Sequence, residues 1–164
     1  MERQIATTLD QSARLLRCGV SADTADMCWF GAIVPRGGSL TSMPEPSEEW
    51  DLWATPYSCM PEEMQATKLM EDFTEIIPAW SLSALLGLLP KEIDIDGYKY
   101  RISIYFESSD EPVIGNQWCL YYKPKKHNEK SRIDDVPMYA PDLIECAVLM
   151  IEWLVANGYK LNEQ

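Results

Sequence analysis

The stretch Ile93-Asp94-Ile95-Asp96-Gly97-Tyr98-Lys99-Tyr100 decides the fold class, because it predicts a β-hairpin. An Asp-Gly pair between alternating apolar residues is typical of a two-residue type I′ turn. Such a turn places Ile95 opposite Tyr98 and Ile93 opposite Tyr100, so both pairs share one face of the sheet. The same alternation continues this apolar face along the second strand, through Ile102, Ile104 and Phe106.

The residues that flank the hairpin predict the rest of the C-terminal half. Trp118, Leu120 and Tyr122 alternate as expected for a third strand. Ser81 is a good N-cap for a preceding helix that Pro90 ends, and an apolar stripe predicts a following helix from Pro141 to about Asn157. We therefore predict, over residues 79–160, a helix, a three-stranded antiparallel meander and a helix that packs on its apolar face.

Residues 1–78 have a less regular pattern. Thr8 and Gln11 form a capping box that predicts a helix to about Cys18. Residues 27–34 predict a strand, and residues 50–54 predict a short strand that pairs back on it. The length of 164 residues suits one domain. The expectation is a single α+β domain over residues 1–164.

The charge of the chain is strongly and unevenly negative. There are 26 acidic and 14 basic residues, for a net charge of −12. Residues 45–76 hold nine of the acids and one lysine, whereas residues 123–132 hold five basic residues and one acid. A polyanion repels phosphate backbones, so direct nucleic-acid binding is disfavoured. The basic stretch is expected to be a solvated loop.

The cysteines indicate a reducing compartment. Their number is odd, their spacings are wide, and no Cys-x-x-Cys pair occurs, which predicts free thiols in a cytoplasmic protein; they are Cys18, Cys28, Cys59, Cys119 and Cys146. No apolar run approaches the length that a membrane-spanning helix needs, so we expect no membrane association.

No catalytic constellation is evident. The single histidine, His127, lies in the basic stretch, without a nucleophile motif near it. Asp134 and Asp135 have no partner that the sequence fixes, and Gly37-Gly38 lacks a phosphate-loop context. We predict no catalytic residue, no cofactor and no metal ligand.

One candidate interaction surface combines aromatic and acidic residues. Tyr105 and Tyr121 are expected on the sheet face opposite the core, beside basic residues. The tryptophans of the N-terminal half would form an exposed apolar patch if that half packs loosely, or would instead fill a second small core. The candidate residues are Trp29, Trp50, Trp53, Glu48, Glu49, Asp51, Tyr105 and Tyr121.

Three stretches carry a resemblance: Thr8-Leu9-Asp10-Gln11-Ser12, Thr24-Ala25-Asp26-Met27 and Ile77-Pro78-Ala79-Trp80-Ser81-Leu82-Ser83-Ala84-Leu85-Leu86. Together they resemble a group of small proteins from Bacteroides-type gut bacteria that prophages and other mobile elements often carry. The resemblance implies a bacterial cytosolic setting and a mobile-element context. It implies no activity, cofactor or site residue.

Three functions follow as hypotheses. The first is a non-catalytic protein-interaction or accessory protein of a bacterial mobile element, whose partner and oligomeric state the sequence leaves open. The second is an acidic inhibitor or nucleic-acid mimic, which would use the acids of residues 45–76. The third is a small enzyme that uses cysteine or carboxylate chemistry, for which a shifted pKa at the base of a cleft would be the sign.

Overall fold

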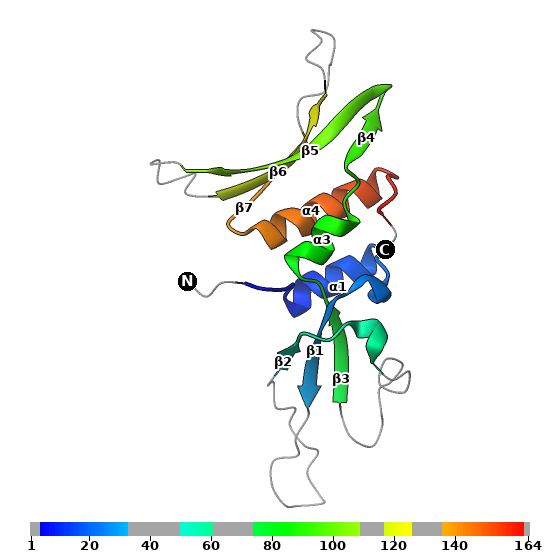
Figure 1. Ribbon diagram of the computed structural model, residues 1–164, viewed down its shortest axis with the longest axis vertical. Coiled ribbons are helices and arrows are strands. Elements are labelled where there is room, and N and C mark those ends of the chain that lie inside the picture. Colours follow the sequence, from blue (N-terminus) through cyan, green and yellow to red (C-terminus); the bar gives the residue numbers. More distant parts are fainter. Residues whose placement is uncertain (1–3, 33–49, 61–73, 109–116, 126–135, 163–164) are drawn as a thin grey trace, which may run out of the picture.

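A computed structural model describes residues 4–32, 50–60, 74–108, 117–125 and 136–162 (Figure 1). Within them the chain has three α-helices and two antiparallel sheets, which confirms the α+β class. A four-stranded sheet lies at one end of the view and a three-stranded sheet at the other, with the helices between them (Figure 1).

The N-terminal part builds the three-stranded sheet. Helix α1 (Leu9–Arg17) begins at the predicted capping box, since the Thr8 hydroxyl accepts a hydrogen bond from the Gln11 amide at 3.2 Å. Strand β1 (Met27–Ala32) pairs with β2 (Trp50–Trp53), as predicted, and also with β3 (Thr74–Ala79). Two short 3-10 turns, Ala22–Thr24 and Tyr57–Cys59, complete this part.

The C-terminal part has one strand more than predicted. Helix α3 (Leu82–Leu88) precedes β4 (Glu92–Ile95), β5 (Tyr98–Glu107) and β6 (Gln117–Pro124). The prediction of three strands is wrong because β7 (Val136–Ala140) adds a fourth, in the order β4-β5-β6-β7, before helix α4 (Leu143–Ala156). The sequence did not predict this strand because it contains Pro137, which argues against a strand in the middle of a sheet. Proline is tolerated at the edge of a sheet, where β7 lies.

The hairpin has the predicted register. Ile95 pairs with Tyr98 and Ile93 with Tyr100. Asp96 and Gly97 have φ values of 53° and 81°, as the two central residues of a type I′ turn require. The Asp94 carboxylate accepts the Gly97 amide hydrogen at 2.8 Å, which holds the turn closed.

The main core lies between the four-stranded sheet and the helices. Helix α4 packs on β6 and β7, and α3 packs on α4. Buried side chains meet there from every one of these elements, among them Leu85, Leu120, Tyr122, Ala140, Met150, Ile151 and Leu154. A smaller cluster under the three-stranded sheet contains the buried side chains of Cys28, Met60 and Ile76.

The apolar face of β5 is only partly covered. Ile104 and Phe106 lie on the helix-facing side by register, yet 39% and 49% of their surfaces stay exposed. This end of β5 runs past the N-terminal end of α4 (Figure 1). Phe106 instead packs against the Trp118 ring in an edge-to-face arrangement, with ring centroids 5.0 Å apart.

Helix α1 connects the two parts of the molecule. It packs against β3 on one side and α4 on the other. Arg14 donates to Glu145 at 2.7 Å and to Glu152 at 2.6 Å, both on α4. These hydrogen bonds hold the pKa of Arg14 above its usual value, chiefly through Glu152. The buried Gln11 amide donates to Glu145 at 2.6 Å in the same network.

Candidate functional site

The outer side of the four-stranded sheet carries a row of tyrosines, which we call the tyrosine face. By register, Tyr105 lies across from Cys119, and Cys119 lies across from Tyr139. Tyr121 is two residues farther along β6 and shares this side, as predicted for Tyr105 and Tyr121. The described helices all lie on the other side of the sheet (Figure 1). The residues of the tyrosine face are Ser103, Tyr105, Cys119, Tyr121, Pro137 and Tyr139.

The three tyrosines enclose a shallow cavity of about 290 Å³. The hydroxyls of Tyr105 and Tyr139 are hydrogen-bonded at 3.2 Å across β6. The rings of Tyr105 and Tyr121 meet edge to face, with centroids 5.4 Å apart. Cys119 lines the cavity and is fully buried, whereas Tyr105 and Tyr139 keep 38% and 43% of their surfaces exposed. The cavity therefore has an aromatic rim that solvent and ligands can reach.

The Tyr105 hydroxyl of this cavity is a neutral hydrogen-bonding group. Hydrogen bonds with Tyr139 and then Cys119 raise the pKa of Tyr105 above its usual value. A protonated phenol both donates and accepts hydrogen bonds. The cavity is thus suited to hold peptide carbonyl or amide groups against aromatic rings.

Basic residues line the β4–β5 end of the same side. Lys99, Arg101 and Lys123 lie on this side by register. Glu92 accepts a hydrogen bond from Lys125 at 2.7 Å. It also forms an ion pair with Arg101, at 3.6 Å. The bond from Lys125 lowers the pKa of Glu92. The side is therefore aromatic at its centre and basic toward one end, in a chain of net charge −12.

The tryptophan candidates divide between the two sides of the three-stranded sheet. Trp29 and Trp50 are half-buried on one side by register, and the Trp29 indole donates to the Thr7 carbonyl at 2.8 Å. The exposed Trp53 is on the other side and stacks on Phe30, with centroids 4.6 Å apart. They do not form one continuous surface with each other, nor with Tyr105 and Tyr121 on the other sheet.

The charged candidates are mostly beyond the described residues. Asp51 is exposed on β2, opposite Phe30. Glu48 and Glu49 lie outside the described residues, as do His127, Asp134 and Asp135. The acidic segment 45–76 therefore contributes one described carboxylate, Asp51, to any surface, since the side chain of Glu75 is not described either.

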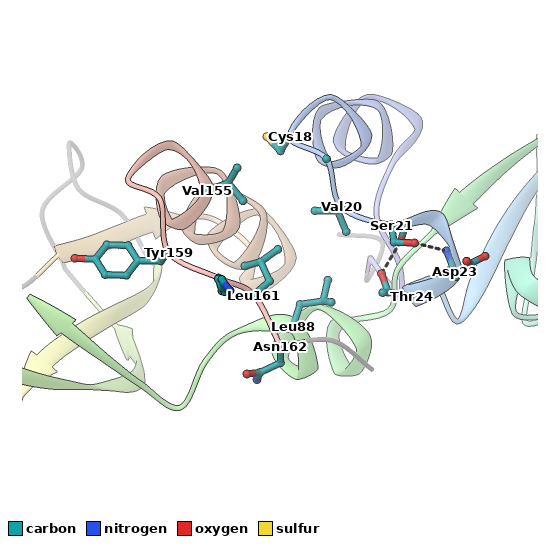
Figure 2. Close-up of a pocket in the computed structure, with 12 residues that line it drawn as sticks. Cys18, Val20, Ser21, Asp23, Thr24, Leu88, Val155, Tyr159, Leu161 and Asn162 are labelled. Carbon is teal, nitrogen blue, oxygen red and sulfur yellow. Dashed lines mark hydrogen bonds between the residues drawn. The ribbon is translucent and has the colours of Figure 1, made fainter.

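A larger pocket, of about 680 Å³, lies where α1, α3, α4 and the C-terminal segment meet (Figure 2). Its apolar lining comes from Val20, Leu88, Val155 and Leu161. Several polar groups around it are used within the fold. Thr24 donates to the Ser21 carbonyl at 2.7 Å, and the Asn162 amide donates to the carbonyl of Leu89 at 2.8 Å.

The buried thiols of Cys28 and Cys146 have raised pKa values. Burial raises the pKa of Cys146 from 9.0 to about 11, and burial also raises the pKa of Cys28. A reactive cysteine needs the opposite shift, because the thiolate is the nucleophile. At neutral pH both thiols are protonated and act as small apolar groups, the Cys146 thiol donating to the Trp118 carbonyl at 3.2 Å.

Sequence reasoning missed Cys119, Pro137 and Tyr139 as members of the tyrosine face. The alternation of Val136, Met138 and Ala140 is a weak strand signal, and the prolines at positions 137 and 141 argue against a strand there. With that strand in place, the period of two would have placed Tyr139 on the same side of the sheet as Tyr105.

The described part of the chain has neither a metal-ligand cluster nor a membrane-spanning helix. No group of three His, Cys, Asp or Glu residues there is placed to hold a metal ion. No described helix is both long enough and apolar enough to cross a membrane. Comparisons of this chain with protein-family models, with curated proteins and with solved structures find no match.

Proposed function

We propose that this chain is a non-catalytic protein-interaction protein that binds its partner through the tyrosine face. The observation that carries the proposal is the exposure of Tyr105 and Tyr139 around a cavity, on a side of the sheet that none of the described helices covers. Tyrosine is enriched in protein interfaces, where a rigid ring supplies contact area at a small entropic cost and its hydroxyl supplies a hydrogen bond. The resemblance to mobile-element proteins suggests an accessory role in a bacterial cytoplasm.

The raised pKa values of Cys28 and Cys146 argue against these two buried thiols as nucleophiles. A buried neutral thiol is a poor nucleophile. The hydroxyls of Tyr105 and Tyr139 are bonded to each other, which orders the two rings without a ligand. An ordered aromatic surface loses less entropy when a partner binds.

Site-specific photocrosslinking in living cells tests the proposal. A photoreactive phenylalanine analogue replaces Tyr139 in one variant and Leu16 in a matched control. Leu16 is exposed to a similar degree, 39% against 43%, but lies on α1. We expect a discrete crosslinked protein band from position 139 that position 16 does not give. Equal crosslinking from both positions, or none from position 139, would contradict the proposal.

A further inference from the structure

The tyrosine face has the chemistry to bind an extended peptide that contains proline and acidic residues. Proline-containing segments dock in grooves lined by aromatic rings, whose hydroxyls donate to peptide carbonyls. The rings of Tyr105, Tyr121 and Tyr139 around one cavity provide such a groove. The next positions along the same side are basic and select for carboxylates.

The charges on this side divide into paired and available groups. Glu92 is shared by Lys125 and Arg101, whereas Lys99 and Lys123 form no ion pair with any residue that the structure describes. Lys123 is exposed, in the same strand as Tyr121 and two residues from it. A strand rises about 3.3 Å per residue, so Lys123 lies roughly 13 Å along β6 from Cys119 at the cavity.

One segment of this chain has the complementary chemistry. Residues 44–49 read Pro-Glu-Pro-Ser-Glu-Glu, with two prolines followed by two adjacent acids. In an extended peptide, four residues span about 13 Å, which matches the spacing along β6 from Cys119, on the far side of the cavity from Lys123, to Lys123 itself. A proline at position 44 in the cavity would therefore set Glu48 near Lys123. Each proline also has a fixed φ angle, which lowers the entropic cost of binding.

The segment that reaches this face would come from another molecule. Residues 44–49 lead into β2, which begins at the end of the three-stranded sheet farthest from the helices (Figure 1). The tyrosine face lies on the opposite side of the molecule, beyond the helices (Figure 1). We propose that the tyrosine face binds residues 44–49 of a second copy of this chain. This inference rests on the proposed function, because it names the partner of the same face.

A charge-swap experiment on the full chain tests the proposal. The face variant carries Lys99→Glu and Lys123→Glu, and the segment variant carries Glu48→Lys and Glu49→Lys. Sedimentation velocity measures self-association of each protein alone and of the two variants mixed. Wild type is expected to self-associate at micromolar to submillimolar concentration, and each variant alone to associate at least about tenfold more weakly. The mixture is expected to recover association, because opposite charges then meet.

Two controls separate this contact from general charge effects. Lys91→Glu with Lys160→Glu makes the same change of net charge at exposed positions off the tyrosine face, and should associate as wild type does. A labelled synthetic peptide of residues 42–50 should bind wild type, and bind the face variant at least about tenfold more weakly. Tyr139→Ala should also weaken peptide binding, and its circular dichroism spectrum shows whether it folds.

Several outcomes would overturn the proposal. They are a wild-type chain that stays monomeric and does not bind the peptide, a mixture that fails to recover association, and association that the face variant retains. Binding of a labelled single-stranded oligoribonucleotide in place of the peptide would show that the face recognises RNA instead. Crosslinks from position 139 to a different protein, with no self-association, would reject the second copy as partner and leave the proposed function standing.

Discussion

The two sheets of this chain differ in how they are stabilised. The four-stranded sheet buries a continuous core against α3 and α4, with the side chains of Leu120, Tyr122 and Ile151 fully buried. The three-stranded sheet has a small buried cluster of Cys28, Met60 and Ile76. Hydrophobic stabilisation scales with the apolar area removed from water, so the first sheet carries most of the stability.

The comparison also shows what each sheet leaves available for contact. The four-stranded sheet is covered on one side, so its other side can hold exposed rings on a rigid support. The three-stranded sheet places aromatic rings on both sides, and its most exposed tryptophan, Trp53, is stacked on Phe30. Rigid elements position binding groups better than loosely packed ones do. This difference favours the tyrosine face over the tryptophans as a binding surface.

Matched isoleucine truncations should show the largest difference between the sheets. Ile151→Ala removes a side chain that is fully buried under the four-stranded sheet, and we expect a loss of about 2–5 kcal/mol in the free energy of unfolding. Ile76→Ala acts in the small cluster, where 8% exposure and fewer buried neighbours give a loss near the lower end of that range. Urea denaturation followed by circular dichroism measures both. An equal or larger loss for Ile76→Ala would contradict the comparison.

A glycine substitution in each sheet should separate steric from conformational strain. A Cβ at Gly31 would approach the Trp50 ring at 2.8 Å, so Gly31→Ala should displace that ring and cost about 1–3 kcal/mol. A Cβ at Gly97 would contact nothing, but φ there is 81°, so Gly97→Ala should cost about 1 kcal/mol of backbone strain. Hydrogen exchange should localise the first effect to β1 and β2 and the second to β4 and β5. Effects that spread over both sheets would show that they unfold as one unit.

A substitution in α1, the helix between the sheets, should lower the free energy of unfolding by less than the isoleucine truncations do. Arg14→Gln removes the ion pairs to Glu145 and Glu152, and we expect a loss of about 1–2 kcal/mol, because these groups are only partly buried. The matched control is Arg17→Gln, on the same helix at an exposed position. Exchange of β1–β3 amides should speed up more than that of β4–β7 amides. If Arg17→Gln has the same effect, the ion pairs do not contribute.

At neutral pH the Cys146 thiol has the smallest effect, because its influence on stability appears only as the pH becomes alkaline. Burial raises the pKa of Cys146 in the folded chain from 9.0 to about 11, so the unfolded chain loses this proton first. The resulting stabilisation is complete below about pH 9 and is lost as the pH rises to about 11. Cys146→Ala should therefore flatten the decline of stability in this window relative to wild type. Parallel pH profiles for the two proteins would show that this thiol does not titrate as described.

Local signals predicted the elements that have a clear pattern. The Asp96-Gly97 turn, the Thr8 capping box and the pairing of residues 50–53 with β1 are all present as predicted. The two strands that the sequence did not reveal, β3 and β7, each contain a proline and each lie at the edge of a sheet. An edge position tolerates the missing amide, but only tertiary pairing shows that the position is an edge.

The candidate site was accessible to prediction only in part. The period of two placed Tyr105 and Tyr121 on the side opposite the core, because alternation fixes which way a strand residue faces. Tyr139 was not predicted because it lies on β7, which the sequence did not reveal. Its hydroxyl contact with Tyr105 depends on the order of the strands in the sheet. The exposure of Ile104 and Phe106 depends on where α4 begins relative to β5, which no local pattern contains.

The bond between Gln11 and Glu145 has a consequence for how the chain folds during its synthesis. The two residues are 134 positions apart, so α1 leaves the ribosome long before α4 exists. At about 5–20 residues per second, the interval is roughly 7–27 s. Throughout it, the side chain of Leu15, fully buried in the finished protein, has no partner on α4. The side of α1 that faces α4 thus stays without its partner until α4 has been made, whereas the contact of α1 with β3 can form earlier.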